Sequence, residues 1–286
     1  MSYAKKRIDV TITLGKGQFG DTPGDEVTLT GLRVSANTLI YNGDMQGQLQ
    51  LRVWGMTMPL INQLTRIGHV QNQHRANKIV VTAGEESGSM ATVFEGSIET
   101  AYGDFAGAPE VVFNVFARSV GIMSVKPSKP RSYPSAVAVA DIMEDLAKEM
   151  GSTFEKNDVI EMLPAGTYFS GSAMDQVKAC ARAAAINFTA DRGKLAIWSR
   201  NGYRRSTPIK VSAATGMVGY PAFSSNGIVL TTLFNADFET GGRALVESDI
   251  PVACGLWNIA RVAHSIESEM PDGAWFSQIT GQVNVP

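Results

Sequence analysis

The sequence contains few of the residue types that most often carry chemistry. It has two cysteines, Cys180 and Cys254, and three histidines, His69, His74 and His264. Cys180 falls on the apolar stripe of a predicted helix, which favours a buried free thiol over a disulfide. No apolar run is long enough to span a bilayer. These shortages argue against a disulfide-stapled or membrane-spanning protein and leave little material for a metal site.

Charge is also sparse. Charged residues make up 18% of the chain, the formal net charge is −2 and the pI is about 6.0. The basic residues are scattered, and the richest stretches, residues 5–7 and 126–131, are typical of strand ends or linkers. This argues against direct binding of nucleic acid. Ile8, Val10, Ile12 and Leu14 alternate with polar residues, which predicts a strand and not a signal peptide. We expect a soluble protein made in the cytoplasm, without stable membrane binding.

One segment, residues 134–198, is clearly helical in pattern. Apolar residues recur at helical spacing after Pro134, namely Val139, Ile142, Met143, Leu146 and Met150. Ser135 is the predicted N-cap and Gly151 the predicted left-handed stop.

A second helix is predicted from Ser172, which forms a capping-box pattern with Asp175. Its stripe is narrow: Met174, Val177, Cys180, Ala181 and Ala184. Short strands are expected at 152–155 and 187–190, and residues 191–193 turn the chain into a strand at 194–199. The segment therefore predicts a small α/β unit.

The flanking regions alternate with period two. Before the α/β unit, strands are expected at 8–14, 27–30, 49–53, 79–82, 91–102 and 111–118. One helix interrupts them, with Thr57 as cap, Pro59 near its start, and Leu60, Leu64 and Ile67 on one face before Gly68. After it, strands are expected at 217–223, 228–234, 243–247, 256–267 and 275–283.

The predicted fold is mainly β, with two antiparallel β-barrels or sandwiches flanking the α/β unit. The predicted domains are a first barrel (1–125), a Pro-rich linker (126–134), the α/β domain (135–205) and a second barrel (206–286). The linker carries three prolines, which remove backbone donors and hold the chain extended.

Tests for known catalytic and binding motifs fail. Residues 15–20 match G-x-G-x-x-G, but the chain then enters another strand, so a glycine-rich hairpin loop is favoured over a dinucleotide site. His69 and His74 are five residues apart in a polar loop, which is not a zinc spacing, and His264 is interpreted as a solvated or interface residue. No G-x-S-x-G elbow and no cysteine nucleophile context occur.

Paired carboxylates are the remaining route to an enzyme. Asp141, Glu144 and Asp145 lie on the outward face of the predicted helix, and Glu85 and Glu86 lie in a turn. Both sets are typical of solvated surface. We therefore predict no catalytic, cofactor-binding or metal-binding residue, and no cofactor.

Three stretches carry a resemblance to a known family: residues 98–110 (IETAYGDFAGAPE), 215–221 (TGMVGYP) and 273–276 (GAWF). They resemble the baseplate hub proteins of tailed bacteriophages, especially those of Pseudomonas and Burkholderia phages. The similarity runs along nearly the whole chain and includes no catalytic signature.

The resemblance implies a structural role. Three hub subunits, each with two tube-like barrels, would form a pseudo-sixfold ring that adapts the hexameric tail tube to the trimeric spike. The implied partners are two further copies of the chain, the tail tube or an adjoining tail protein, the spike and the tape-measure protein. The implied location is the virion tail baseplate, after assembly in the host cytoplasm.

Two other functions stay open at this point. A tail-tip peptidoglycan hydrolase would need two carboxyl groups facing each other in a groove. A carbohydrate- or receptor-binding module would need exposed aromatic residues, whereas Trp54, Trp198, Trp257 and Trp275 mostly fall on predicted strands, where core packing is favoured. Loops 16–23 and 69–78 are the expected contact loops. A mildly acidic lumen is expected to repel DNA.

Overall fold

The computed structural model describes residues 4–15, 25–65, 77–121, 126–225 and 227–282. The chain divides into two compact units, which we describe separately. Unit 1 comprises Met1–Leu39, Gly47–Gly121 and Ala263–Phe276, and unit 2 comprises Ile40–Gln46, Ile122–Val262 and Ser277–Pro286. The fold is mainly β, as predicted.

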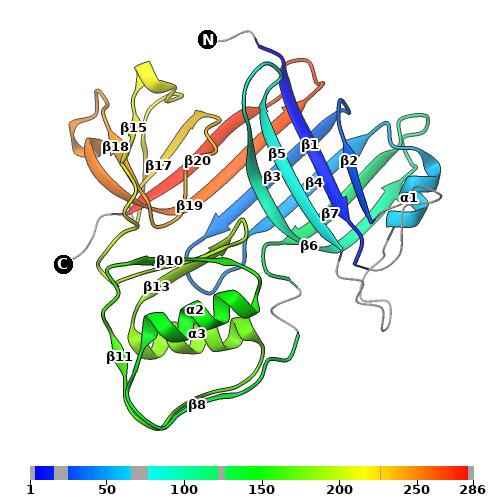
Figure 1. Cartoon of the computed structure of the whole chain (residues 1–286). Coiled ribbons are helices and arrows are strands. Elements are labelled where there is room, and N and C mark those ends of the chain that lie inside the picture. Colours follow the sequence, from blue (N-terminus) through cyan, green and yellow to red (C-terminus); the bar gives the residue numbers. More distant parts are fainter. Residues whose placement is uncertain (1–3, 16–24, 66–76, 122–125, 226, 283–286) are drawn as a thin grey trace. The chain divides into compact units, whose positions relative to one another are not determined.

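Unit 1 is built on one antiparallel sheet (Figure 1). Its strands follow the order β3-β4-β7-β6-β5-β1-β2. They are β1 (Lys6–Thr13), β2 (Glu26–Leu29), β3 (Val34–Tyr41), β4 (Gln48–Trp54), β5 (Lys78–Glu85), β6 (Met90–Asp104) and β7 (Val112–Arg118). The last residues of β19 (Gly255–Ser268) join this unit through side-chain hydrogen bonds from Ser265 to Asn37 and from Ser35 to Glu267.

Alternating apolar residues build the core of unit 1. Ile8, Val10 and Ile12 of β1 are at most 1% exposed, and their partner strand β5 buries Ile79 and Val81 opposite them. This confirms the strand predicted at the N-terminus. Burial of alternate side chains on one face is what fixes the register of such a sheet.

Strand β3 was not predicted. Its inward residues are Val34, Ala36, Thr38 and Ile40, and all four are buried. Ala36 is small and Thr38 is polar, so the alternation of hydrophobicity is weak in the sequence. The strand forms because residues Val34–Leu39 pair with β4, a long-range contact that the local pattern does not reveal.

Helix α1 (Met58–Leu64) begins after Thr57, as predicted, and packs against β6. Its buried residues are Ile61 and Leu64, whereas Leu60 is only half-buried. Leu60 and Leu64 are four residues apart and lie on one face of the helix, as predicted, and the helix ends at Leu64. Ile67 and Gly68 lie outside the described residues.

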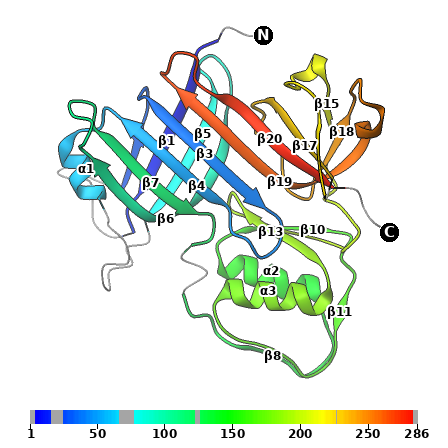
Figure 2. The same ribbon diagram turned by 180° about the vertical axis from the view of Figure 1, so that it is seen from behind.

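Unit 2 contains the predicted α/β part (Figure 2). Helices α2 (Val139–Glu149) and α3 (Ala173–Ala184) pack side by side, and α2 packs against β10 (Thr153–Asn157). Strand β14 (Lys194–Trp198) lies parallel to β10 and forms a hairpin with β13 (Asn187–Asp191). The predicted helices, strands and hairpin turn are confirmed.

At the helix ends, two predictions are confirmed and one is wrong. Ser172 Oγ accepts a hydrogen bond from the Asp175 backbone N–H at 3.1 Å, and Asp175 Oδ2 accepts one from the Ser172 N–H at 3.0 Å. This is the predicted capping box. The N-cap of α2 is Ala138 and not Ser135, because Val137–Ala138 forms a short strand, β9, paired with β11 (Met162–Leu163). Gly151 has φ +67° after α2, as predicted.

The segment predicted as a linker contains secondary structure. Arg131–Tyr133 forms β8, which pairs with β12 (Thr167–Phe169). The Arg131 guanidinium donates to Gln176 Oε1 at 3.0 Å and to Glu149 Oε2 at 2.7 Å. This part of the chain is thus attached to α2 and α3. The proposed division into three domains stays a prediction.

The rest of unit 2 is again β. Strands β16 (Ala222–Ser224), β17 (Gly227–Leu233), β20 (Trp275–Gln282) and β19 follow in this order, and β18 (Arg243–Val246) pairs with β19 and with β15 (Ile209–Val211). Two short 3₁₀ helices, η2 (Ala213–Thr215) and η3 (Pro251–Ala253), join them. Of the strand predicted at 217–223, only the end forms, in β16. The core includes Trp257, Ile259 and Val262, and closure into barrels stays a prediction.

Candidate functional site

Of the three histidines, His264 is the one that lies within the described residues. His264 is 2% exposed in β19, so its interpretation as solvated was wrong. His69 and His74 lie outside the described residues. Within the part of the chain that the structure describes, no group of three or more His, Cys, Asp or Glu side chains is placed to hold a metal ion.

The candidate carboxylates lie on the surface, as predicted. Asp141 and Asp145 are exposed on α2, and Glu144 pairs with Lys148 at 2.8 Å. Glu86 lies in the turn after β5. These carboxyl groups are exposed or half-buried.

The cysteines and tryptophans behave mostly as core residues. Burial raises the pKa of Cys180 to about 12, so this thiol is inert, whereas Cys254 is exposed; both are free. Trp198 and Trp257 are 2% and 8% exposed, and Trp54 and Trp275 are half-buried. No helix among the described residues is long and apolar enough to cross a membrane.

The two expected contact loops lie largely outside the described residues. At their ends, Asn77 is buried and its Oδ1 accepts a hydrogen bond from the Gly15 N–H at 3.2 Å. The role of these loops in contacts stays a prediction.

A cluster of six charged side chains in unit 2 was missed by the sequence analysis. We call it the ionic cluster: Glu155, Asp191, Arg192, Lys194, Arg204 and Glu239. Arg204 is 4% exposed, and its Nη2 lies 2.6 Å from Glu155 Oε2 and 2.7 Å from Glu239 Oε2. Lys194 Nζ is 3.2 Å from Glu155 Oε2, and Arg192 Nη2 is 3.3 Å from Glu239 Oε1.

The cluster joins the α/β part to the β part of unit 2. Glu155 belongs to β10, and the segment from Asp191 to Lys194 runs from the end of β13 through the turn to the start of β14. Glu239 precedes β18. Arg192 Nη1 also donates to the Ala236 carbonyl at 2.9 Å, and Thr240 Oγ1 donates to Thr189 Oγ1 at 3.1 Å. No local pattern reveals this cluster, because the partners lie tens of residues apart.

Two of the three carboxyl groups of the cluster, Glu155 and Asp191, have pKa values shifted in opposite directions. Hydrogen bonding by Arg204, opposed by burial, lowers the pKa of Glu155 to about 2. Burial raises the pKa of Asp191, although Arg192 opposes this, and Asp191 Oδ1 has no hydrogen-bond partner among the described residues. The three cations and three carboxyl groups of the ionic cluster form a structural clamp between the two parts of unit 2.

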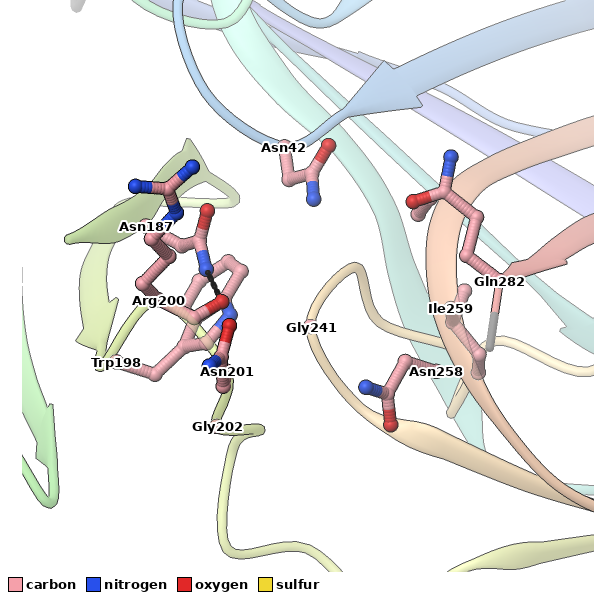
Figure 3. Close-up of a pocket in the computed structure, with 11 residues that line it drawn as sticks. Asn42, Asn187, Trp198, Arg200, Asn201, Gly202, Gly241, Asn258, Ile259 and Gln282 are labelled. Atoms are coloured by element: carbon pink, nitrogen blue, oxygen red, sulfur yellow. Dashed lines mark hydrogen bonds between the residues drawn. The ribbon is translucent and has the colours of Figure 1, made fainter. Parts of the chain in front are cut away.

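A polar pocket of about 280 Å³ lies beside the clamp in unit 2 (Figure 3). Arg200 and Trp198 line one wall, Asn258, Ile259 and Gln282 line the other, and Asn42 lies above them. Five of the lining side chains are carboxamides: Asn42, Asn187, Asn201, Asn258 and Gln282. None of the lining residues is acidic. We call this the carboxamide pocket.

Each unit ends in an edge strand. In unit 1 the last strand is β2, and in unit 2 it is β16, whose three residues are all exposed. Near β16, Val218, Tyr220, Phe223 and Leu233 are 43–66% exposed. No charged residue occurs from 211 to 236. Edge strands of soluble proteins usually carry charges that prevent further pairing, so an uncharged apolar edge is typical of an assembly surface.

Comparisons with known proteins agree with an assembly role. The family described as "Baseplate hub gp41" matches residues 7–276. No curated protein sequence matches the chain.

Several solved structures share the fold. A tail protein from Neisseria meningitidis MC58 has a TM-score of 0.62 at 10% identity, covering 97% of both chains. A 43 kDa tail protein of prophage MuSo2 from Shewanella oneidensis has a TM-score of 0.58 at 11% identity, covering 96% of both. The E. coli c3393 protein has a TM-score of 0.59 at 11% identity, covering 95% of this chain and 76% of its own; it is described as a type VI secretion component similar to T4 tail proteins gp27 and gp5.

These identities are low, so the structures establish the fold, whereas the family match covers nearly the whole sequence. The chain therefore belongs to the Baseplate hub gp41 family and is a structural, non-enzymatic component of the bacteriophage tail.

Proposed function

We propose that three copies of this chain form a ring of pseudo-sixfold symmetry that joins the hexameric tail tube to the trimeric spike. The observation that carries this proposal is the presence of two compact, strand-rich units in one chain. Three copies supply six such units, which is the number needed to match a sixfold tube. The same three copies match a threefold spike.

The edge strands support this proposal. A heterologous contact between unlike surfaces produces a closed ring when the rotation between copies closes. Strands β2 and β16 are the two terminal strands of the strand order and belong to different units. Exposed apolar side chains flank β16, and no charged residue occurs near it in the sequence. When such edges pair between subunits, strands that could otherwise cause aggregation form an assembly contact.

The proposed partners follow from this position in the tail. They are two further copies, the tube or an adjoining tail protein, the spike and the tape-measure protein, joined in the baseplate after assembly in the host cytoplasm. DNA is a passing cargo and not a ligand, since the net charge of −2 and the scattered basic residues favour repulsion of phosphate.

Light scattering of the purified chain, alone and mixed with its candidate spike, tests the ring. We expect the mass of three copies, either for the chain alone or only with the spike. A chain that stays monomeric at all concentrations and does not bind the spike would contradict the proposal.

The variant Phe223→Asp tests the β16 edge, with the distant surface change Asp145→Asn as control. We expect Phe223→Asp to weaken assembly because it places a charge on an apolar contact.

A further inference from the structure

We propose that the carboxamide pocket binds an acidic side chain, Asp or Glu, carried by an extended peptide segment of a partner protein. The proposal deepens the proposed function, on which it rests for the existence of such a partner. It names the chemistry that the partner presents to unit 2.

The positive charge of the pocket comes from Arg200. Its guanidinium makes no ion pair and no side-chain hydrogen bond within the described part of the chain, and the Arg200 side chain is exposed beside the pocket. Most other arginines of unit 2, such as Arg192 and Arg204, are paired with carboxylates. An unpaired guanidinium at a pocket without acidic residues favours a carboxylate, which it binds with two parallel hydrogen bonds.

The carboxamides favour a peptide as the carrier of this carboxylate. A carboxamide offers both donors and an acceptor, as a peptide group does. Asn187 uses its Nδ2 on the carbonyls of Ser199 and Arg200, at 3.3 Å and 2.9 Å. The side chains of Asn42 and Gln282 form no hydrogen bond within the described residues, and they lie at the pocket in Figure 3. They are therefore free to hold the backbone on either side of the acidic residue.

The geometry argues against a sugar. A saccharide usually stacks on an exposed aromatic ring, but Trp198 is 2% exposed and Gly241 lies against its ring. A Cβ added at Gly241 would lie 2.7 Å from Trp198 Cζ2. The volume of about 280 Å³ lies near the lower end of the range of small-molecule pockets, which suits one side chain with its flanking peptide groups.

Peptide titration followed by NMR tests the proposal on the whole chain. The probes are the blocked tripeptide acetyl-Gly-Glu-Gly-amide and its Gln analogue, and the readout is the shift of the Trp198 indole N–H and the Asn42 side-chain amide. We expect saturable binding of the Glu peptide with a dissociation constant on the order of 1 mM and at least about tenfold weaker binding of the Gln peptide.

Variants identify the residue responsible. Arg200→Gln should reduce the affinity for the Glu peptide about tenfold, to the level of the Gln peptide. Arg182→Gln is the matched control, because Arg182 is also exposed but lies on α3 away from the pocket lining. Equal binding of the two peptides, no binding of either, or unchanged binding by Arg200→Gln would overturn the proposal.

The pocket proposal and the ring proposal are tested by different readouts. The mass of wild-type protein with the spike tests the ring, and peptide binding tests the pocket. Peptide binding by a chain that never forms a trimer would overturn the ring alone. A trimer whose pocket binds no acidic peptide would overturn the pocket alone.

Discussion

The guanidinium of Arg204 donates two hydrogen bonds to the carboxylate of Glu155, from Nε at 2.8 Å and from Nη2 at 2.6 Å. The two residues are 49 positions apart, on either side of the β13–β14 hairpin. Because Arg204 is 4% exposed and also contacts Glu239, this pair connects the α/β part of unit 2 to its β part.

Removing the charge of Glu155 should destabilise unit 2. We expect Glu155→Gln to lower the free energy of unfolding by about 2–3 kcal/mol, because Arg204 would keep its buried charge with one carboxylate fewer. Urea unfolding followed by circular dichroism measures the change. Asp145→Asn, on the exposed surface of α2, is the control and should change stability by less than about 0.5 kcal/mol. Equal effects of the two variants would contradict the clamp.

The same pair predicts a dependence on pH. The pKa of Glu155 is lowered from 4.5 to about 2 in the folded chain, so the folded state binds the proton less readily than the unfolded state. Its contribution to stability is therefore present above about pH 4.5 and is lost as the pH falls through about 2. Unfolding curves across this range should show a shallower loss of stability for Glu155→Gln than for the wild type. Parallel curves would show that Glu155 does not carry this dependence.

The helix caps give a matched pair of substitutions. Ser172→Ala should cost about 1 kcal/mol, because it removes the acceptor for the Asp175 N–H in the capping box of α3. Ser135→Ala should cost less than about 0.5 kcal/mol, because α2 begins after Ala138 and Ser135 is not its cap. Thermal or urea unfolding compares them. A larger cost for Ser135→Ala would mean that the helix begins where the sequence pattern placed it.

Gly241 should be less replaceable than another glycine with a similar backbone. Gly241 has φ +80° and Gly219 has φ +70°, so alanine is strained at both positions. Only at Gly241 does the new Cβ meet a ring, that of Trp198, at 2.7 Å; nothing lies within 4 Å at Gly219. We expect Gly241→Ala to lose about 2 kcal/mol more stability than Gly219→Ala. Similar losses of stability for the two variants would contradict the close approach of the Trp198 ring to Gly241.

Local patterns of the sequence predicted the elements whose burial is periodic. The stripe of α2, the capping box of α3 and the alternation of β1 all appear in the structure as expected. Strand β3 was missed because Ala36 and Thr38 weaken its alternation, and the start of α2 was misplaced because Val137–Ala138 pairs with β11. Both errors come from tertiary pairing that overrides local preference.

The candidate sites were harder to predict. Glu155 and Arg204 lie in different elements, and the pocket residues Asn42, Arg200 and Gln282 come from three distant segments. No spacing in the sequence brings such residues together, since long-range pairing of strands creates the neighbourhood. The family could be recognised from the sequence, because the similarity extends over nearly the whole chain and does not depend on any one site.

The copy number of this chain at the tail tip tests the central claim most directly. Cryo-electron microscopy of purified tails, with this chain located by its two β-sheet units, measures it. We expect three copies between the last sixfold ring of the tube and the spike, with six β-sheet units arranged around the channel. Six copies, or a single copy outside the channel, would contradict the ring.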